Sequence, residues 1–184
     1  MKFARIALAA ILTVAMLSAP NLFGDRTAFV RPAAAQALSV RVYFSPEDQP
    51  SRILIAVFDH AQRQILFAIY DLTNRPIADA LIGAARRHID VWGIMDLSES
   101  RSRRNLYPEL EAALGNHLAL RSGSGRYGIM HDKYAIVDGS IVATGSYNWS
   151  YSADRSNREN LLIITNPELA QQFAQNFRTI WQSP

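Results

Sequence analysis

Apolar residues recur along this chain with two periods, one typical of β-strands and one typical of helices. Val40 and Val42 alternate with their neighbours at the start of the first stretch, and alternation is the pattern of a half-buried strand. Strands are predicted at residues 39–44, 65–70, 89–95, 118–121 and 160–165. Helices are predicted at residues 51–62, from Asn74 and Pro76 onward, at 109–114, and from Asn166 through the apolar stripe that ends at Trp181.

This order of elements predicts a single α/β domain. Strands that alternate with helices favour an α/β sandwich, in which helices flank a mixed β-sheet. The segment 65–70 is continuously apolar, as expected of a central strand that is covered on both faces. A hairpin within residues 131–148 follows the alternating part, and we find no internal repeat or second domain in residues 38–184.

The first 37 residues have the pattern of a targeting segment. Lys2 and Arg5 precede an uncharged, mostly apolar run from Ile6 to Gly24, and small residues follow at 33–37. A secretory signal peptide has this order, which predicts a periplasmic or secreted protein. A retained membrane anchor is the alternative, because the charged stretch 25–32 is long for the tail of a signal peptide.

Net charge gives no support for a nucleic-acid partner. The chain has 19 Lys and Arg and 16 Asp and Glu, but four of the basic residues and one acidic residue precede Gln36, so the remainder carries 15 of each. Only local clusters can then indicate binding to a phosphate backbone. Such contacts are predicted for Arg101, Arg103, Arg104 and Arg126. A solvated surface is the alternative reading of these residues.

Two further features of composition limit the chemistry. The chain has no cysteine, which excludes disulfides, a thiol nucleophile and a cysteine-based zinc site. It has only two lysines, Lys2 and Lys133, and Arg supplies the positive charge elsewhere. A compact ammonium differs from a planar guanidinium. We therefore interpret Lys133 as a position where Arg would not serve.

The stretch from His131 to Asn148 carries the predicted chemistry. Gly139 and Ser140 lie between two β-rich runs and predict a two-residue hairpin turn. In that register the numbers of cross-strand partners sum to 279, which places Lys133 opposite Ser146 and His131 opposite Asn148. A neutral imidazole is a nucleophile or a proton carrier. Beside it, an ammonium with hydroxyl and amide donors would hold a phosphate, and no cluster of carboxylates flanks the hairpin to bind a metal.

The spacing of these residues resembles a known motif. His131-x-Lys133, Asp138, Gly145-Ser146 and Asn148 match the HKD motif of the phospholipase D superfamily, and Glu159 falls where that family places the carboxylate partner of the histidine. From about Leu38 onward the chain resembles the compact, single-motif bacterial endonuclease (Nuc) branch. The resemblance implies a phospholipase D-like fold and two-step hydrolysis of a phosphodiester, without metal or other cofactor.

The resemblance also implies a role for each matched residue. His131 would form a phosphohistidine, Lys133, Ser146 and Asn148 would bind the phosphate, and Glu159 would orient the imidazole. Gly145 is expected to permit a close approach of the backbone. For Asp138 a supporting catalytic role and a role in the turn or in an ion pair are both open, because it ends the strand.

The mechanism of the family requires two histidines, whereas this chain has one motif. A second His-x-Lys is impossible downstream of the leader, because Lys133 is the only lysine there. A symmetric homodimer that joins two copies of the hairpin would complete the site. The first expectation is an exported endonuclease that acts on DNA or RNA. The alternatives are a phospholipase D that acts on lipid headgroups, at a membrane if the N-terminal segment is retained, and a phosphate-binding module without turnover.

Overall fold

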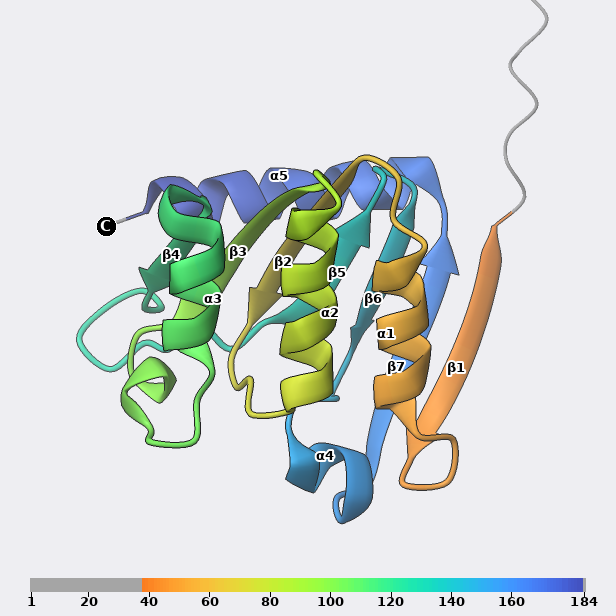
Figure 1. Ribbon diagram of the computed structural model, residues 1–184, viewed down its shortest axis with the longest axis horizontal. Coiled ribbons are helices and arrows are strands. Elements are labelled where there is room, and N and C mark those ends of the chain that lie inside the picture. Colours follow the sequence, from red (N-terminus) through yellow and green to blue (C-terminus); the bar gives the residue numbers. More distant parts are fainter. Residues whose placement is uncertain (1–37, 184) are drawn as a thin grey trace, which may run out of the picture. The chain divides into compact units, whose positions relative to one another are not determined.

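One mixed sheet organises the domain in a computed structural model that describes residues 38–183 (Figure 1). Its strand order is β1-β7-β6-β5-β2-β3-β4. The strands are β1 (Ser39–Ser45), β2 (Gln64–Ile69), β3 (Asp90–Asp96), β4 (Leu118–Arg121), β5 (Lys133–Val137), β6 (Ile141–Gly145) and β7 (Glu159–Thr165). The predicted α/β sandwich with a mixed sheet is confirmed. The predicted signal peptide or anchor at 1–37 lies outside the described residues.

The strand directions bring distant parts of the chain to one edge of the sheet. β2, β3 and β4 run parallel, whereas β5 is antiparallel to β2, and β6, β7 and β1 continue the antiparallel order. The carboxyl ends of β2, β3 and β6 therefore lie beside the first residues of β5 and β7. We call this border the site edge, and we call the border where β2 and β3 begin the far edge.

Helices cover both faces of the sheet (Figure 1). On one face lie α1 (Pro50–Asp59), α2 (Arg75–Arg86) and α3 (Tyr107–Leu114), and α5 (Pro167–Gln182) crosses the other. The Asn166 side chain caps α5 by accepting a hydrogen bond of 2.7 Å from the amide of Leu169. Two short 3-10 turns, η1 (Glu99–Arg101) and η2 (Gly115–His117), flank α3. Separate apolar cores fill the two faces.

A short helix, α4 (Tyr151–Arg155), occupies part of the predicted polar loop after the hairpin. The pattern of the sequence did not indicate it, because one polar turn has no apolar stripe. Its first residues are capped by the Ser150 hydroxyl, which accepts from the amide of Ala153 at 3.3 Å. The carboxylate of Asp154 then accepts from the amide of Ser51 at 3.0 Å and from its hydroxyl at 2.9 Å, which fixes α4 to the start of α1.

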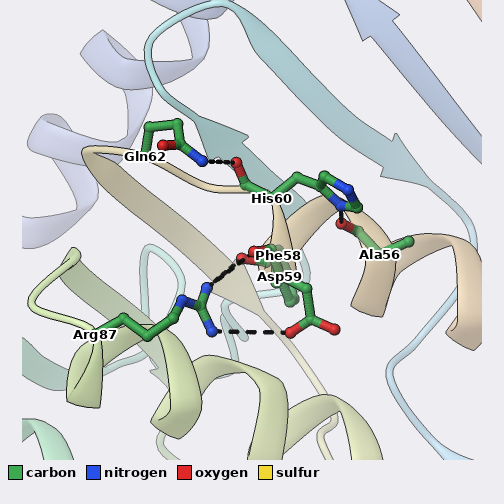
Figure 2. A network of polar contacts seen from close by, with 6 residues as sticks. All are labelled: Ala56, Phe58, Asp59, His60, Gln62 and Arg87. Carbon is green, nitrogen blue, oxygen red and sulfur yellow. Dashed lines mark hydrogen bonds and ion pairs between the residues drawn. The ribbon is translucent and has the colours of Figure 1, made fainter.

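The far edge is held by contacts between α1 and α2 (Figure 2). The Arg87 guanidinium donates to the carbonyls of Phe58 and Asp59 at 3.0 and 3.3 Å, so it satisfies the last carbonyls of α1. His60 follows α1 here, with Nδ1 2.7 Å from the carbonyl oxygen of Ala56. The two other non-motif histidines, His88 before β3 and His117 before β4, also lie at this edge. All three are thus separated from His131 by the length of the sheet.

The hairpin register differs by one residue from the prediction. Val137 pairs with Ile141 and Tyr134 with Thr144, so partner numbers sum to 278 and the turn has three residues. Asp138 and Gly139 both adopt positive φ, 53° and 67°. The Asp138 carboxylate holds this wider turn by accepting from the amides of residues 62, 63 and 64 at 2.9, 2.8 and 3.0 Å. Lys133 consequently lies level with Gly145 instead of Ser146, and His131 precedes the strand.

Candidate active site

His131 and Lys133 meet around the ring of Tyr70 at the site edge. The imidazole of His131 is exposed and lies edge-on to the Tyr70 ring, with the two ring centres 4.5 Å apart at an interplanar angle of 62°. The Lys133 ammonium lies 5.0 Å from the centre of the same ring. Its Nζ donates to the backbone carbonyl of His131 at 2.7 Å. Because an ammonium has three donors, two remain for a substrate oxygen.

The environment of Lys133 lowers the affinity of its amino group for a proton. Partial burial lowers the pKa of Lys133 from its ordinary value, while Asp132, Glu159 and Asp71 act in the opposite direction. Asp71 follows β2 directly, and its own pKa is raised by burial and by the nearby charge of Glu99. The ammonium thus lies in a polar setting that still removes part of its hydration, which strengthens its attraction for a phosphate.

A chain of carboxylates supports the Tyr70 ring. The Tyr70 hydroxyl donates to Glu99 at 3.0 Å. The side chain of Asp96, only 1% exposed, accepts through Oδ1 from the amide of Glu99 at 3.0 Å and through Oδ2 from the amide of Met130 at 2.8 Å. Asp96 therefore fixes both the turn that holds Tyr70 and the residue before His131.

The sequence reading missed Tyr70, Asp71, Asp96 and Glu99. Three of them lie at or just after the carboxyl ends of the parallel strands β2 and β3, where α/β sheets commonly form their sites. That position was the available signal. Within residues 38–183, no group of three or more His, Cys, Asp and Glu side chains is arranged to hold a metal ion.

Gly145 and Ser146 bring the end of β6 against the start of β7. A Cβ atom at Gly145 would lie 2.2 Å from the carbonyl oxygen of Asn160, so only glycine permits this approach. The Ser146 hydroxyl donates to Glu159 Oε2 at 2.6 Å and accepts from the amide of Asn160 at 3.1 Å. Asn157 donates to the other oxygen of Glu159 at 3.1 Å. Within the described chain, the Glu159 carboxylate thus contacts Ser146 and Asn157 instead of His131.

Asn148 is anchored in the same segment. Its Oδ1 atom is buried, and no hydrogen-bond partner for it is found among the described residues. The buried Tyr147 beside it donates its hydroxyl to Asp154 at 3.0 Å, which ties the segment to α4. Trp149 is 1% exposed and packs against Phe58 and Phe67, so it is a core residue. The hairpin, α4 and the core thus fix the backbone on which Ser146 and Asn148 lie.

Asp138 lies away from these residues, at the far edge. It is five residue steps from Lys133 along extended chain, or roughly 17 Å at 3.3–3.4 Å per residue. Three backbone amides donate to its carboxylate and lower its pKa against the effect of partial burial. The structure therefore does not bring Asp138 to the candidate site, and its contacts are those of a residue that fixes a turn.

The arginines predicted to contact nucleic acid lie next to the site. Arg101 belongs to η1, the turn that also carries Glu99, and it lines a shallow pocket with Ser122 and Gly128. Arg103 and Arg104 follow it, and all three are exposed. Arg126 is exposed at the tip of the loop before the motif, with its guanidinium carbon 5.5 Å from the centre of the Tyr127 ring. A positive surface thus borders the approach to His131.

Comparison with known proteins gives one consistent family. The model of the cardiolipin synthase, PLD-like domain matches residues 54–181. A phospholipase D of Rickettsia felis is 31% identical over 139 residues, which cover 75% of this chain and 67% of that protein. A mitochondrial cardiolipin hydrolase of Xenopus laevis is 31% identical over 132 residues, or 72% of this chain. The chain spans only 60% of the length of the frog protein.

Solved structures extend the comparison to the fold. Nuc, a phospholipase D family member from Salmonella typhimurium, superposes with a TM-score of 0.69 at 32% identity, over 79% of this chain and 95% of Nuc. NucT from Helicobacter pylori gives a TM-score of 0.72 at 27% identity, over 80% of this chain and 98% of NucT. Both matches include nearly the whole of the other chain. This protein therefore belongs to the phospholipase D superfamily, in its Nuc-like single-domain branch, and is a phosphodiester hydrolase.

Proposed function

We propose that this protein is a metal-independent phosphodiesterase that acts through a phosphohistidine, and that it is an endonuclease for DNA or RNA without sequence preference. The observation that carries the proposal is the position of His131 and Lys133 on one aromatic ring at the site edge. An imidazole and an ammonium therefore lie side by side, in the hairpin that also carries the Ser146 hydroxyl and the Asn148 amide. Attack on a phosphodiester requires a nucleophile such as the imidazole. Stabilisation of its transition state requires cationic and hydrogen-bond-donating groups such as the others.

The proposed reaction has two steps. In the first, a nitrogen of neutral His131 attacks phosphorus, a P–N bond forms, and the P–O bond to the leaving group breaks. A second histidine gives its proton to the leaving oxygen. In the second step, this histidine takes a proton from water, the water oxygen attacks phosphorus, and the P–N bond breaks. Lys133 stabilises the negative charge on the non-bridging oxygens in both steps.

The second histidine comes from a second copy of the chain in this proposal. His60, His88 and His117 lie at the far edge, which supports the inference that one chain supplies half a site. A two-fold axis beside the site edge would bring two His131 side chains together. Glu159 would then orient an imidazole in the assembled dimer, because within one chain its oxygens engage Ser146 and Asn157.

A nucleic-acid substrate is favoured by the exposed arginines beside the site and by the fold match, which includes nearly all of Nuc and of NucT. A phospholipid is the alternative substrate, because several relatives are named phospholipase D or cardiolipin hydrolase. None of the helices described between residues 38 and 183 is long and apolar enough to cross a membrane. We further propose export to the periplasm or the medium, on the pattern of residues 1–37.

One experiment separates these substrates. The purified protein, in excess chelator, is incubated with plasmid DNA, with RNA and, separately, with phosphatidylcholine vesicles. Nicking of nucleic acid that is lost in His131→Ala supports the proposal, and His60→Ala serves as the matched histidine control. Choline release with intact nucleic acid would establish the lipid alternative. Loss of all activity in chelator would overturn the metal-independent mechanism.

A second experiment tests the shared site. Specific activity and mass, measured over a dilution series by turnover assays and sedimentation, should fall together as dimers dissociate. A monomer that keeps full activity would contradict the half-site proposal. Mixing an excess of His131→Ala with wild-type chain should lower the activity below that of the same amount of wild type alone. Most wild-type subunits would then have a partner without the second histidine.

A further inference from the structure

A groove beside His131 has a composition unlike that of the surrounding positive surface. It has a volume of about 960 Å³ and runs between the loop 122–132 and the last turns of α5. His131 is among the residues that line it. Hydroxyl, amide and apolar side chains form most of its walls, among them Ser122, Ser124, Ile129, Asn176, Thr179 and Ile180.

Both walls of the groove are fixed by specific contacts. The loop closes at an isolated β-bridge between Ser122 and Ile129. Its two backbone segments pack so closely that a Cβ at Gly128 would lie 2.3 Å from the Ser124 carbonyl oxygen. Asp96 holds the amide of Met130 at the base of the loop. On the other wall, Arg121 donates to the carbonyl of Trp181 at 2.6 Å and so holds the end of α5. The groove is thus part of the folded domain.

The charges around the groove indicate what it can accept. Among the described residues that line it, only His131 and Asp132 have ionisable side chains, and none is Arg or Lys. A second phosphate would find no cation there and would lie near the Asp132 carboxylate. The arginines instead lie outside, with Arg101 in the pocket on the other side of the loop and Arg126 at its tip. An uncharged part of the substrate therefore fits the groove.

In-line geometry indicates which part this is. The attacking nitrogen of His131 and the leaving oxygen occupy opposite apical positions of the transition state. The leaving group consequently departs on the side away from His131, whereas the groove is lined by His131 itself. A group in the groove must therefore be attached to the ester oxygen that stays on phosphorus.

We propose that this groove binds the nucleoside, its base and sugar, that remains attached to the phosphoryl group on His131. The inference rests on the proposed function and adds a subsite to it. The apolar side chains of Ile129 and Ile180 would contact the base, and the hydroxyl and amide groups would hydrogen-bond to base or sugar. The arginines outside would contact the neighbouring phosphates.

The test compares esters that share one leaving group. Thymidine 3′-(p-nitrophenyl phosphate) and thymidine 5′-(p-nitrophenyl phosphate) are compared with methyl p-nitrophenyl phosphate and glycerol 3-(p-nitrophenyl phosphate). We expect kcat/KM for at least one thymidine ester to exceed that of the methyl ester by about tenfold or more, as a largely buried ligand group should provide. Equal values for the thymidine and methyl esters would overturn the nucleoside subsite. A preference for the glycerol ester would overturn it in favour of a lipid backbone.

Matched variants connect the preference to the groove. Thr179→Phe fills the groove from an exposed position of α5, whereas Gln172→Phe places the same ring on the same helix face about two turns earlier and outside the groove. Thr179→Phe should abolish the thymidine preference, whereas Gln172→Phe should keep it and leave the methyl ester rate within about twofold of wild type. An unchanged preference in Thr179→Phe would contradict the proposal. No hydrolysis of any ester by wild type would count against the proposed function itself.

Discussion

The ammonium nitrogen of Lys133 lies 5.0 Å from the centre of the Tyr70 ring, at the border of the sheet where His131, the nucleophile of the proposed reaction, also contacts that ring. A ring face attracts a cation and excludes water from one side of it. Tyr70 can therefore hold the imidazole and the ammonium in a fixed mutual position. Its own hydroxyl is held by Glu99, so the ring cannot turn away freely.

Removal of the Tyr70 ring should reduce turnover. A cation–π contact contributes about 0.5–2 kcal/mol, so Tyr70→Leu should lower kcat/KM for a small phosphodiester by roughly 2- to 30-fold. Tyr70→Phe keeps the ring and loses only the bond to Glu99, so its kcat/KM should lie closer to that of wild type. Tyr151→Leu is the control, because Tyr151 also stacks with a cation, in this case Arg155. Equal losses in the Leu and Phe variants would show that the ring face is not the important part.

Asp138 should affect stability and leave turnover unchanged. Three backbone amides donate to its carboxylate at the far edge. Hydrogen bonds to a charged group contribute about 1.5–3 kcal/mol each, so Asp138→Asn should lower the free energy of unfolding by on the order of 2 kcal/mol. Urea unfolding measures this loss, and kcat per folded molecule should equal that of wild type. A folded variant without activity would support the catalytic reading instead.

The same variant has a predicted pH dependence. Because folding lowers the pKa of Asp138, its contribution to stability is present above the unfolded value near 3.9 and is lost as the pH falls through the folded value. The stability difference between wild type and Asp138→Asn should therefore be large at pH 7 and small below about pH 3. A difference that stays constant over this range would mean that the charge does not hold the turn.

The sequence predicted the strands more closely than the hairpin register. Apolar periodicity is local, and it located the five strands outside the hairpin within one residue of their observed bounds. The register depends on Asp138, whose carboxylate binds amides of Gln62, Arg63 and Gln64 that are distant in the sequence. No local pattern contains that contact. α4 was missed for a related reason, since it depends on the bond between Asp154 and Ser51.

The candidate site was predictable to the extent that its residues are neighbours in the chain. His131, Lys133, Ser146 and Asn148 lie in one hairpin, and their spacing identified them together. Tyr70, Asp96 and Glu99 come from other strands and turns, and only the parallel pairing of β2 and β3 brings them to the same edge. The sheet topology, more than any motif, determines those contacts.

The lowered pKa of Lys133 predicts the alkaline limb of the pH–rate profile. Activity needs the ammonium in the proposed mechanism, so it should fall as the pH rises through a pKa below the ordinary value of 10.5. The charge of Asp132 raises that pKa. Asp132→Asn should therefore move the alkaline limb to lower pH, whereas Asp79→Asn, on the remote face of α2, should not. A limb that does not move in Asp132→Asn would mean that another group sets it.

The exposed arginines of η1 and the segment after it should determine how activity on DNA depends on salt. If Arg101, Arg103 and Arg104 each contact a phosphate, their joint replacement by Ala should reduce the slope of log affinity against log salt by roughly 0.9 per lost contact on duplex DNA. Hydrolysis of a small chromogenic diester should be unchanged, because it has no neighbouring phosphates. The control removes three other exposed arginines, Arg41 of β1, Arg52 of α1 and Arg86 of α2, which carry the same total charge on other elements. Equal slopes for the two triple variants would mean that only net charge matters and that the η1 surface is not the nucleic-acid contact.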